Sequence, residues 1–136
     1  MLYAGKDAPR IALVEDDESL ALLLRYNLEA AGCVVEWNAH GAHALSRLLR
    51  DPPDLVVLDW VVPGLSGIEI LRQIRLNDRT RTIPVLMLTG RTDREDGLRA
   101  KSLGVDAFVA KPFSMADVIA RLQELLLSSS CNPTPL

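Results

Sequence analysis

The stretch Asp54-Leu55-Val56-Val57-Leu58-Asp59 decides the fold, because it is a short apolar run that begins and ends on a carboxylate. Residues 10–15 likewise form a short apolar run that ends on a carboxylate, and residues 83–89 form a third apolar run that ends in the hydroxyl of Thr89. Runs of leucine and β-branched residues without polar alternation are typical of strands that are buried on both faces. We therefore expect these runs to be strands of a parallel sheet that helices cover on both sides.

Helical patterns separate the strands. Leu20, Leu24 and Leu28 recur at helical spacing, and Gly32 then provides a helix stop. Further helices are expected at 42–49, 68–74, 93–103 and 118–125, the last with Ser114 as N-cap, and further short strands at 33–37 and 107–110. This alternation predicts one α/β domain, a doubly wound (βα)5 fold with a flavodoxin-like parallel sheet of order 2-1-3-4-5. The ligand site of such a sheet lies outside the carboxyl ends of strands one and three.

The length and composition fit one soluble globular domain. Of the 136 residues, 49% are hydrophobic and 24% are charged, which is enough apolar material for a sizeable core. We expect the domain to occupy residues 10–127, after an N-terminal extension at 1–9. Residues 128–136 are polar and contain two prolines, so we expect a flexible tail or part of a truncated linker there.

The sequence indicates a cytoplasmic protein without a membrane segment. Its longest apolar runs are far shorter than the roughly 20 residues that span a bilayer, and residues 1–10 contain no stretch like that of a secretory signal. Cys33 and Cys131 lack the paired spacing of a metal or redox motif, so we expect free thiols. The formal net charge of -3 argues against direct binding to nucleic acid, whose phosphates require a clustered basic surface.

Acidic residues gather at the predicted carboxyl ends of strands one and three. Glu15 and Asp16 follow strand one and Asp59 ends strand three, so three carboxylates converge if these strands are neighbours. Like charges this close raise one another's pKa unless a cation neutralises them, and oxygen ligands with room for water suit Mg2+. Thr89 and Lys111 follow strands four and five at the same edge. A carboxylate nucleophile, a divalent cation, an ammonium and a hydroxyl are together suited to handling a phosphoryl group.

Four motifs carry a resemblance to a known family. They are Val14-Glu15-Asp16-Asp17, Leu58-Asp59-Trp60-Val61-Val62-Pro63-Gly64, Leu88-Thr89-Gly90 and Lys111-Pro112-Phe113. Each motif alone is weak, but their joint occurrence in this order is highly specific. Over residues 9–126 the chain resembles the receiver domain of response regulators in two-component systems, and within that family it most resembles the OmpR/PhoB subfamily.

The resemblance implies a phosphoacceptor and a metal site. Asp59 matches the aspartate that accepts the phosphoryl group from a sensor histidine kinase or a small acyl phosphate. Asp16 matches the acid that binds Mg2+ directly, and Glu15 matches its neighbour, which reaches the metal directly or through water. The backbone carbonyl of Val61 matches a further ligand of the ion. Turnover would be limited to the domain's own phosphorylation and dephosphorylation.

The resemblance also implies a switch. Lys111 matches the lysine that contacts the phosphoryl group, and it precedes Pro112 through a peptide bond expected to be cis. Thr89 matches the hydroxyl that moves toward the phosphate, and Phe108 matches the aromatic side chain that turns inward with it. The face formed by helix four, strand five and helix five would change shape as a result.

A phosphorylation-linked homodimer is a further expectation from the subfamily. The chain departs from the subfamily pattern, because it carries Asp106-Ala107-Phe108 where two successive acids are common, and because arginines late in helix five are few. Ion pairs across a symmetric dimer, such as Asp106 with Arg121 or Asp117 with Arg99, are therefore only partly present.

Several interpretations stay open. The subfamily usually carries a C-terminal winged-helix domain that binds DNA, so the chain is either cut within the linker of a transcription regulator or a stand-alone receiver that acts by protein contact. An aspartate-nucleophile phosphohydrolase is disfavoured because Val61 stands where such enzymes have an acidic proton donor. A module that works without phosphorylation is a third interpretation. Trp60 either covers and reports on the site or only packs, whereas His40 and His43 are expected at the surface.

Overall fold

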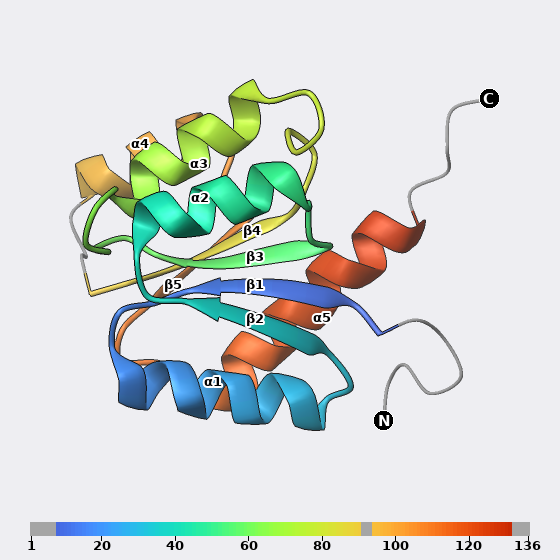
Figure 1. Ribbon diagram of the computed structural model, residues 1–136. Coiled ribbons are helices and arrows are strands. Elements are labelled where there is room, and N and C mark those ends of the chain that lie inside the picture. The colour runs from blue at the N-terminus through green and yellow to red at the C-terminus, as the bar shows by residue number, and fades with distance from the viewer. Residues whose placement is uncertain (1–7, 91–93, 132–136) are drawn as a thin grey trace.

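The computed structural model describes residues 8–90 and 94–131, which form a parallel sheet between two layers of helices (Figure 1). Strands and helices alternate along the chain. In order they are β1 (Arg10–Val14), α1 (Glu18–Ala30), β2 (Val34–Asn38), α2 (Gly41–Arg50), β3 (Leu55–Asp59), α3 (Gly67–Leu76), β4 (Val85–Thr89), α4 (Arg94–Ser102), β5 (Ala107–Ala110) and α5 (Met115–Cys131).

The sheet has the order β2-β1-β3-β4-β5 and all its strand pairs are parallel, as the sequence predicted. In the register, Val14 pairs with Leu58 and Asp59 pairs with Leu88. The carboxyl ends of β1, β3 and β4 therefore lie at one edge of the sheet. This edge includes the point between β1 and β3 where the strand order reverses.

Two cores lie on opposite faces of the sheet. Helices α1 and α5 cover one face, and α2, α3 and α4 cover the other (Figure 1). Residues of β3 alternate between the two cores, so that Leu55 and Val57 face the first core and Val56 and Leu58 face the second. Burial on both faces explains why β3 and β4 have no polar alternation.

Helix α1 begins and ends at the residues that its sequence indicates. The carboxylate of Asp17 accepts a hydrogen bond from the amide of Leu20 at 3.2 Å and caps the N-terminus. At the other end Gly32 adopts a φ of 101°, and the amide of Cys33 donates to the carbonyl of Leu28 at 3.0 Å. This is the Schellman arrangement, in which glycine takes a left-handed conformation that strains other residues.

Helix α5 is longer than the sequence indicated. The sequence analysis assigned residues 128–136 to a tail or linker, whereas α5 continues to Cys131. Serine costs only a few tenths of a kcal/mol more than leucine inside a helix, so residues 128–130 do not stop it, and the first proline is at position 133. Residues 132–136 of that tail and residues 1–7 of the predicted extension lie outside the described residues.

The other boundaries differ from the predicted ones by one or two residues. Strand β2 begins one residue later than expected, and α2 and α3 extend slightly beyond their predicted ranges. Ser114 caps α5, since its hydroxyl accepts from the amide of Asp117 at 3.1 Å, as predicted. Cys33 is a buried free cysteine.

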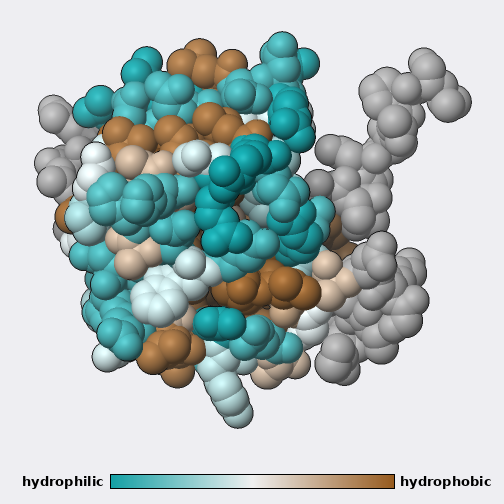
Figure 2. Space-filling model, viewed as in Figure 1, coloured by the Kyte–Doolittle hydropathy of each residue, from teal (hydrophilic) through white to brown (hydrophobic). Residues whose placement is uncertain are grey.

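The surface is mainly polar on the face seen in Figure 2, where hydrophobic residues show in patches between hydrophilic ones. None of the helices within the described ranges combines the length and the apolarity needed to cross a bilayer.

Candidate functional site

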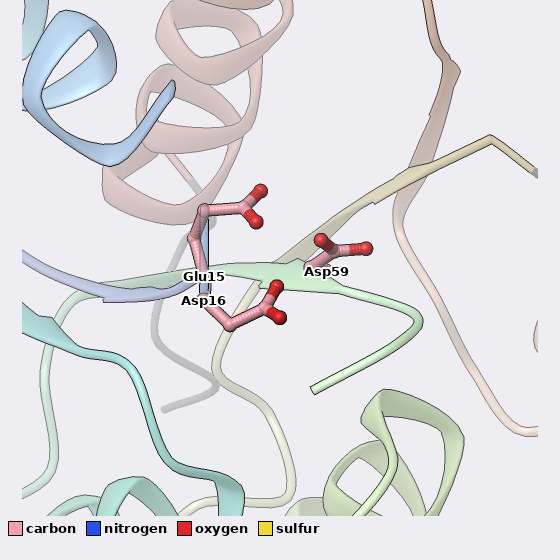
Figure 3. A group of neighbouring side chains, drawn as sticks. All are labelled: Glu15, Asp16 and Asp59. Atoms are coloured by element: carbon pink, nitrogen blue, oxygen red, sulfur yellow. The ribbon is translucent and has the colours of Figure 1, made fainter. Parts of the chain in front are cut away.

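Three carboxylates converge at the carboxyl ends of β1 and β3 (Figure 3). Glu15, Asp16 and Asp59 each offer an oxygen atom, and these atoms lie within 4.8 Å of one another. Glu15 and Asp59 are buried, with 1% and 5% of their surface exposed, whereas Asp16 is exposed at the rim. The cluster therefore has a buried side made by protein and an open side that water can reach.

Lys111 reaches this cluster from the end of β5. Its Nζ atom donates to Oδ2 of Asp59 at 3.0 Å and lies 3.4 Å from Oε1 of Glu15. The backbone positions the lysine, because its amide donates to the carbonyl of Thr89 at 2.6 Å. The Lys111-Pro112 peptide bond is cis, as expected. One ammonium thus contacts both buried carboxylates.

Burial and the neighbouring groups change the pKa values of Glu15 and Lys111. Burial and a hydrogen bond with Asp59 raise the pKa of Glu15 from 4.5 to about 7, against the opposing effects of the Asp17 amide and the Lys111 charge. Burial lowers the pKa of Lys111, but its hydrogen bond to Asp59 and the charges of Asp59 and Glu15 outweigh burial and raise that pKa. The cluster carries more negative charge than Lys111 neutralises, which is the condition that favours a bound cation.

The turn after β3 is tied to Asp59. The amide of Val61 donates to Oδ1 of Asp59 at 3.2 Å, and the amide of Gly67 donates to the carbonyl of Trp60 at 2.9 Å. Val61 as a whole is 60% exposed. Val61 thus lies at the open side of the cluster, where its backbone carbonyl was predicted to act.

The two predicted switch residues lie on neighbouring strands. Thr89 is fully buried at the end of β4, beside Ala110 of β5 in the register. Phe108 of β5 is half-buried and packs against the core under α2, α3 and α4. Its ring meets Trp60 edge to face, with 6.3 Å between the ring centroids. Trp60 is itself buried, so it packs, and whether it also reports on the site stays a prediction.

The predicted dimer residues Arg99, Asp106, Asp117 and Arg121 are all exposed. Asp106 nevertheless has an intramolecular role that the sequence did not reveal. Its Oδ2 atom accepts from Nη2 of Arg75 and from the amide of Val85, both at 2.8 Å. Sequence spacing gave no signal, because Arg75 belongs to α3 and lies 31 residues away.

The two histidines differ from each other. His43 is exposed as predicted, but His40 is only half exposed and its ring lies against Gly64 and against the ring of His43. In the part of the chain that the structure describes, the Nδ1 atom of His40 is buried without a hydrogen-bond partner. The expectation of two surface histidines is therefore wrong for His40, because the turn after β3 packs on it.

Comparison with known proteins agrees with this geometry. The family model for the response regulator receiver domain matches residues 11–123. The phosphate regulon transcriptional regulatory protein PhoB of Rhizobium meliloti is 45% identical over 118 residues, which are 87% of this chain and 52% of that protein. The alkaline phosphatase synthesis transcriptional regulatory protein PhoP of Bacillus subtilis is 39% identical over 120 residues, 88% of this chain and 49% of that protein. The chain thus spans about half the length of these relatives.

Solved structures share the fold. The receiver domain of the sensor histidine kinase PA1611 from Pseudomonas aeruginosa, described with a magnesium ion coordinated in its active site cleft, is 28% identical to this chain. The likeness covers 88% of this chain and 98% of that one, with a TM-score of 0.80. The strand order, the convergent carboxylates and the matched family model lead to one conclusion: the chain belongs to the response regulator receiver domain family and resembles its OmpR/PhoB subfamily.

Proposed function

We propose that Asp59 accepts a phosphoryl group, with the help of Mg2+, and that this modification switches the surface of the domain. The observation that supports the proposal most is the buried carboxylate of Asp59, which lies within 4.8 Å of two further acids and 3.0 Å from the ammonium of Lys111. Receiver domains are in general signalling domains that interact with histidine kinases, and they use Mg2+ at an acidic pocket.

The donor set fits a hard divalent cation. Glu15, Asp16 and Asp59 offer only carboxylate oxygens, and the exposed position of Asp16 leaves room for the water molecules that Mg2+ retains. We propose that these three side chains and the carbonyl of Val61 hold the ion. When bound, Mg2+ would neutralise the carboxylates and the incoming phosphoryl oxygens.

The side chains would then act in phosphoryl transfer as follows. A carboxylate oxygen of Asp59 attacks phosphorus in line, and the bond from phosphorus to the imidazole nitrogen of the kinase histidine breaks, leaving the electron pair on the nitrogen. Lys111, already beside Asp59, offsets the negative charge of the phosphoryl oxygens. The protein would contribute mainly by positioning the reacting groups and by stabilising their charge, which account for most of the catalysis of phosphoryl transfer.

The switch would start from the new charge on Asp59. A phosphoryl group adds strong hydrogen-bond acceptors, so the hydroxyl of Thr89 would gain a hydrogen bond by moving toward it. Phe108 would turn inward into the vacated space. Because Phe108 contacts Trp60 edge to face, this rotation would also change the packing next to Asp59.

The names of the relatives support a proposal for what the switched domain controls. The curated relatives PhoB and PhoP are named transcriptional regulators, and each is about twice as long as the matched part. We propose control of transcription through an output domain outside this chain, in the cytoplasm, without direct DNA contact by the receiver domain. A stand-alone receiver that acts by protein contact is the alternative.

The decisive experiment is incubation with acetyl phosphate and Mg2+, followed by intact mass measurement. Wild-type protein is expected to gain a single phosphoryl adduct, whereas D59N and a sample with EDTA gain none. D54N is the matched control, because Asp54 precedes β3 at its other end and pairs with the amide of Arg10. Adduct formation in D59N, or its absence from folded wild-type protein with Mg2+, would contradict the proposal.

A further inference from the structure

Trp37 makes a polar contact with the site although it belongs to none of the four motifs. It lies on β2, the edge strand, where its Nε1 atom donates to the backbone carbonyl of Glu15 at 2.8 Å. The rest of the indole is partly buried and packs against the core under α1 and α5. The ring therefore has one apolar side in the core and one hydrogen bond directed at the turn that carries Glu15 and Asp16.

The end of β2 holds Glu15 by both of its backbone groups. While Trp37 binds the carbonyl, the amide of Glu15 donates to the carbonyl of Asn38 at 3.2 Å. With both peptide groups fixed, the carboxylate of Glu15 has only its own side-chain torsions left. Its Oε2 atom accepts from the amide of Asp17 at 3.1 Å, which fixes these torsions as well.

The residues after Trp37 hold the second turn of the site. The amide of Gly41 donates to the carbonyl of Pro63 at 2.8 Å, two residues after Val61. Gly41 also lies so close to the backbone of Leu65 that a Cβ atom would sit 2.1 Å from the Leu65 carbonyl oxygen. The segment 37–41 therefore contacts both turns that carry the predicted metal ligands and fixes the spacing between them.

We propose that Trp37 is a positioning residue of the cation site: its indole N–H holds the Glu15 peptide and so sets the distance of Glu15 and Asp16 from Asp59. The inference rests on the proposed function, since it assumes that these acids bind a divalent cation. A residue that only filled space would need the ring but not the N–H group. Replacing Trp37 by phenylalanine separates the two roles, because phenylalanine keeps an aromatic ring and loses the donor.

The first test is a titration of the metal-free protein with Mn2+. The electron paramagnetic resonance signal of free Mn2+ measures how much of the ion remains unbound at each step. W37F is expected to bind Mn2+ about fivefold more weakly than wild type, which is the effect of one lost hydrogen bond. V35A is the matched control. Val35 is buried in the same core from the same strand, so the variant loses stability without touching the Glu15 carbonyl. V35A should bind Mn2+ as wild type does.

A second measurement uses the wild-type protein and does not depend on the folding of a variant. The chain has two tryptophans, so its 15N correlation spectrum shows two indole N–H signals, and the spectrum of W37F assigns them. The Trp37 signal is expected to shift with added Mg2+ in a saturable manner, with the midpoint of metal binding.

The outcomes separate the two claims. Three outcomes would overturn the role of Trp37 without contradicting the cation site. They are an unchanged Mn2+ affinity in W37F, an equal loss of affinity in V35A, and a Trp37 indole signal that does not shift with Mg2+. A wild-type protein that binds no Mn2+ would overturn the site itself and the positioning role with it.

Discussion

The Nζ atom of Lys111 lies 3.0 Å from Oδ2 of Asp59, although 52 residues separate them in the sequence. The same ammonium is 3.4 Å from Oε1 of Glu15. Before any phosphoryl transfer, Lys111 thus offsets part of the charge of the two buried carboxylates. In the proposed function it also contacts the phosphoryl group, so its removal should affect cation binding and phosphoryl transfer in opposite directions.

We expect K111M to bind Mg2+ more tightly than wild type and to be phosphorylated more slowly. A positive charge next to the acids repels a cation, so its loss favours Mg2+. The transfer loses a preorganised charge, which costs on the order of a hundredfold in rate. Mg2+ affinity and the rate of adduct formation with acetyl phosphate measure the two effects, and K101M, at an exposed position of α4, is the control. Weaker Mg2+ binding by K111M would contradict this interpretation.

The raised pKa of Glu15 predicts a pH dependence of stability in the metal-free protein. The folded state keeps a proton on Glu15 up to about pH 7, whereas the unfolded state releases it near the ordinary value of 4.5. Stability from this group is therefore complete below pH 4.5 and is lost as the pH rises through about 7. E15Q cannot titrate, so its unfolding free energy should rise relative to wild type across this range.

Urea denaturation in EDTA at about pH 5 and about pH 8 checks the prediction, because each variant is compared with wild type at the same pH. Mg2+ should show the opposite trend, binding more tightly as the pH rises, since the ion must displace the proton. A constant difference between E15Q and wild type at both pH values would mean that Glu15 is ionised throughout.

The part of the fold that depends on local pattern could be predicted from the sequence. Continuous apolar runs gave the buried strands, and the acids at the ends of two of them gave the cluster of Glu15, Asp16 and Asp59. The hydrogen bond from Trp37 to Glu15 could not be predicted, because it depends on the register in which Leu13 pairs with Trp37. A one-residue shift of that register would turn the indole to the other face of the sheet.

The contacts of Arg75 also could not be predicted from the sequence. Its guanidinium donates to the carbonyls of Gly104 and Ile83 and to the carboxylate of Asp106. These acceptors come from the loops at the amino-terminal edge of β4 and β5, and no spacing rule links them to α3. Together they fasten the loop between α4 and β5 to the rest of the domain.

R75M is therefore expected to destabilise the protein by about 2 kcal/mol, because it leaves several acceptors without their charged donor. R72M is the matched control. Arg72 is on the same helix and pairs with Glu69, but this pair lies at the surface and is screened by water, so R72M should lose clearly less stability than R75M. Urea denaturation at neutral pH measures both values. If R75M and R72M lowered the free energy of unfolding equally, the Arg75 contacts would stabilise the protein no more than a surface ion pair does.

The bond between Arg75 and Asp106 bears on the proposed homodimer. Oδ2 of Asp106 already has two intramolecular donors, so an ion pair with Arg121 of a second copy would compete with them. Among the described residues, no hydrogen bond to the carboxylate of Asp117 is found, so we expect the pair of Asp117 and Arg99 to contribute more to the dimer interface.

Gel filtration with beryllofluoride and Mg2+ tests this pair. Wild type should elute earlier with the phosphoryl mimic, D117R should lose this shift, and the double variant D117R/R99D should recover it. An elution volume of wild type that ignores the phosphoryl mimic would contradict the dimer, and a shift retained by D117R but lost in D106N would assign the interface to Asp106 instead.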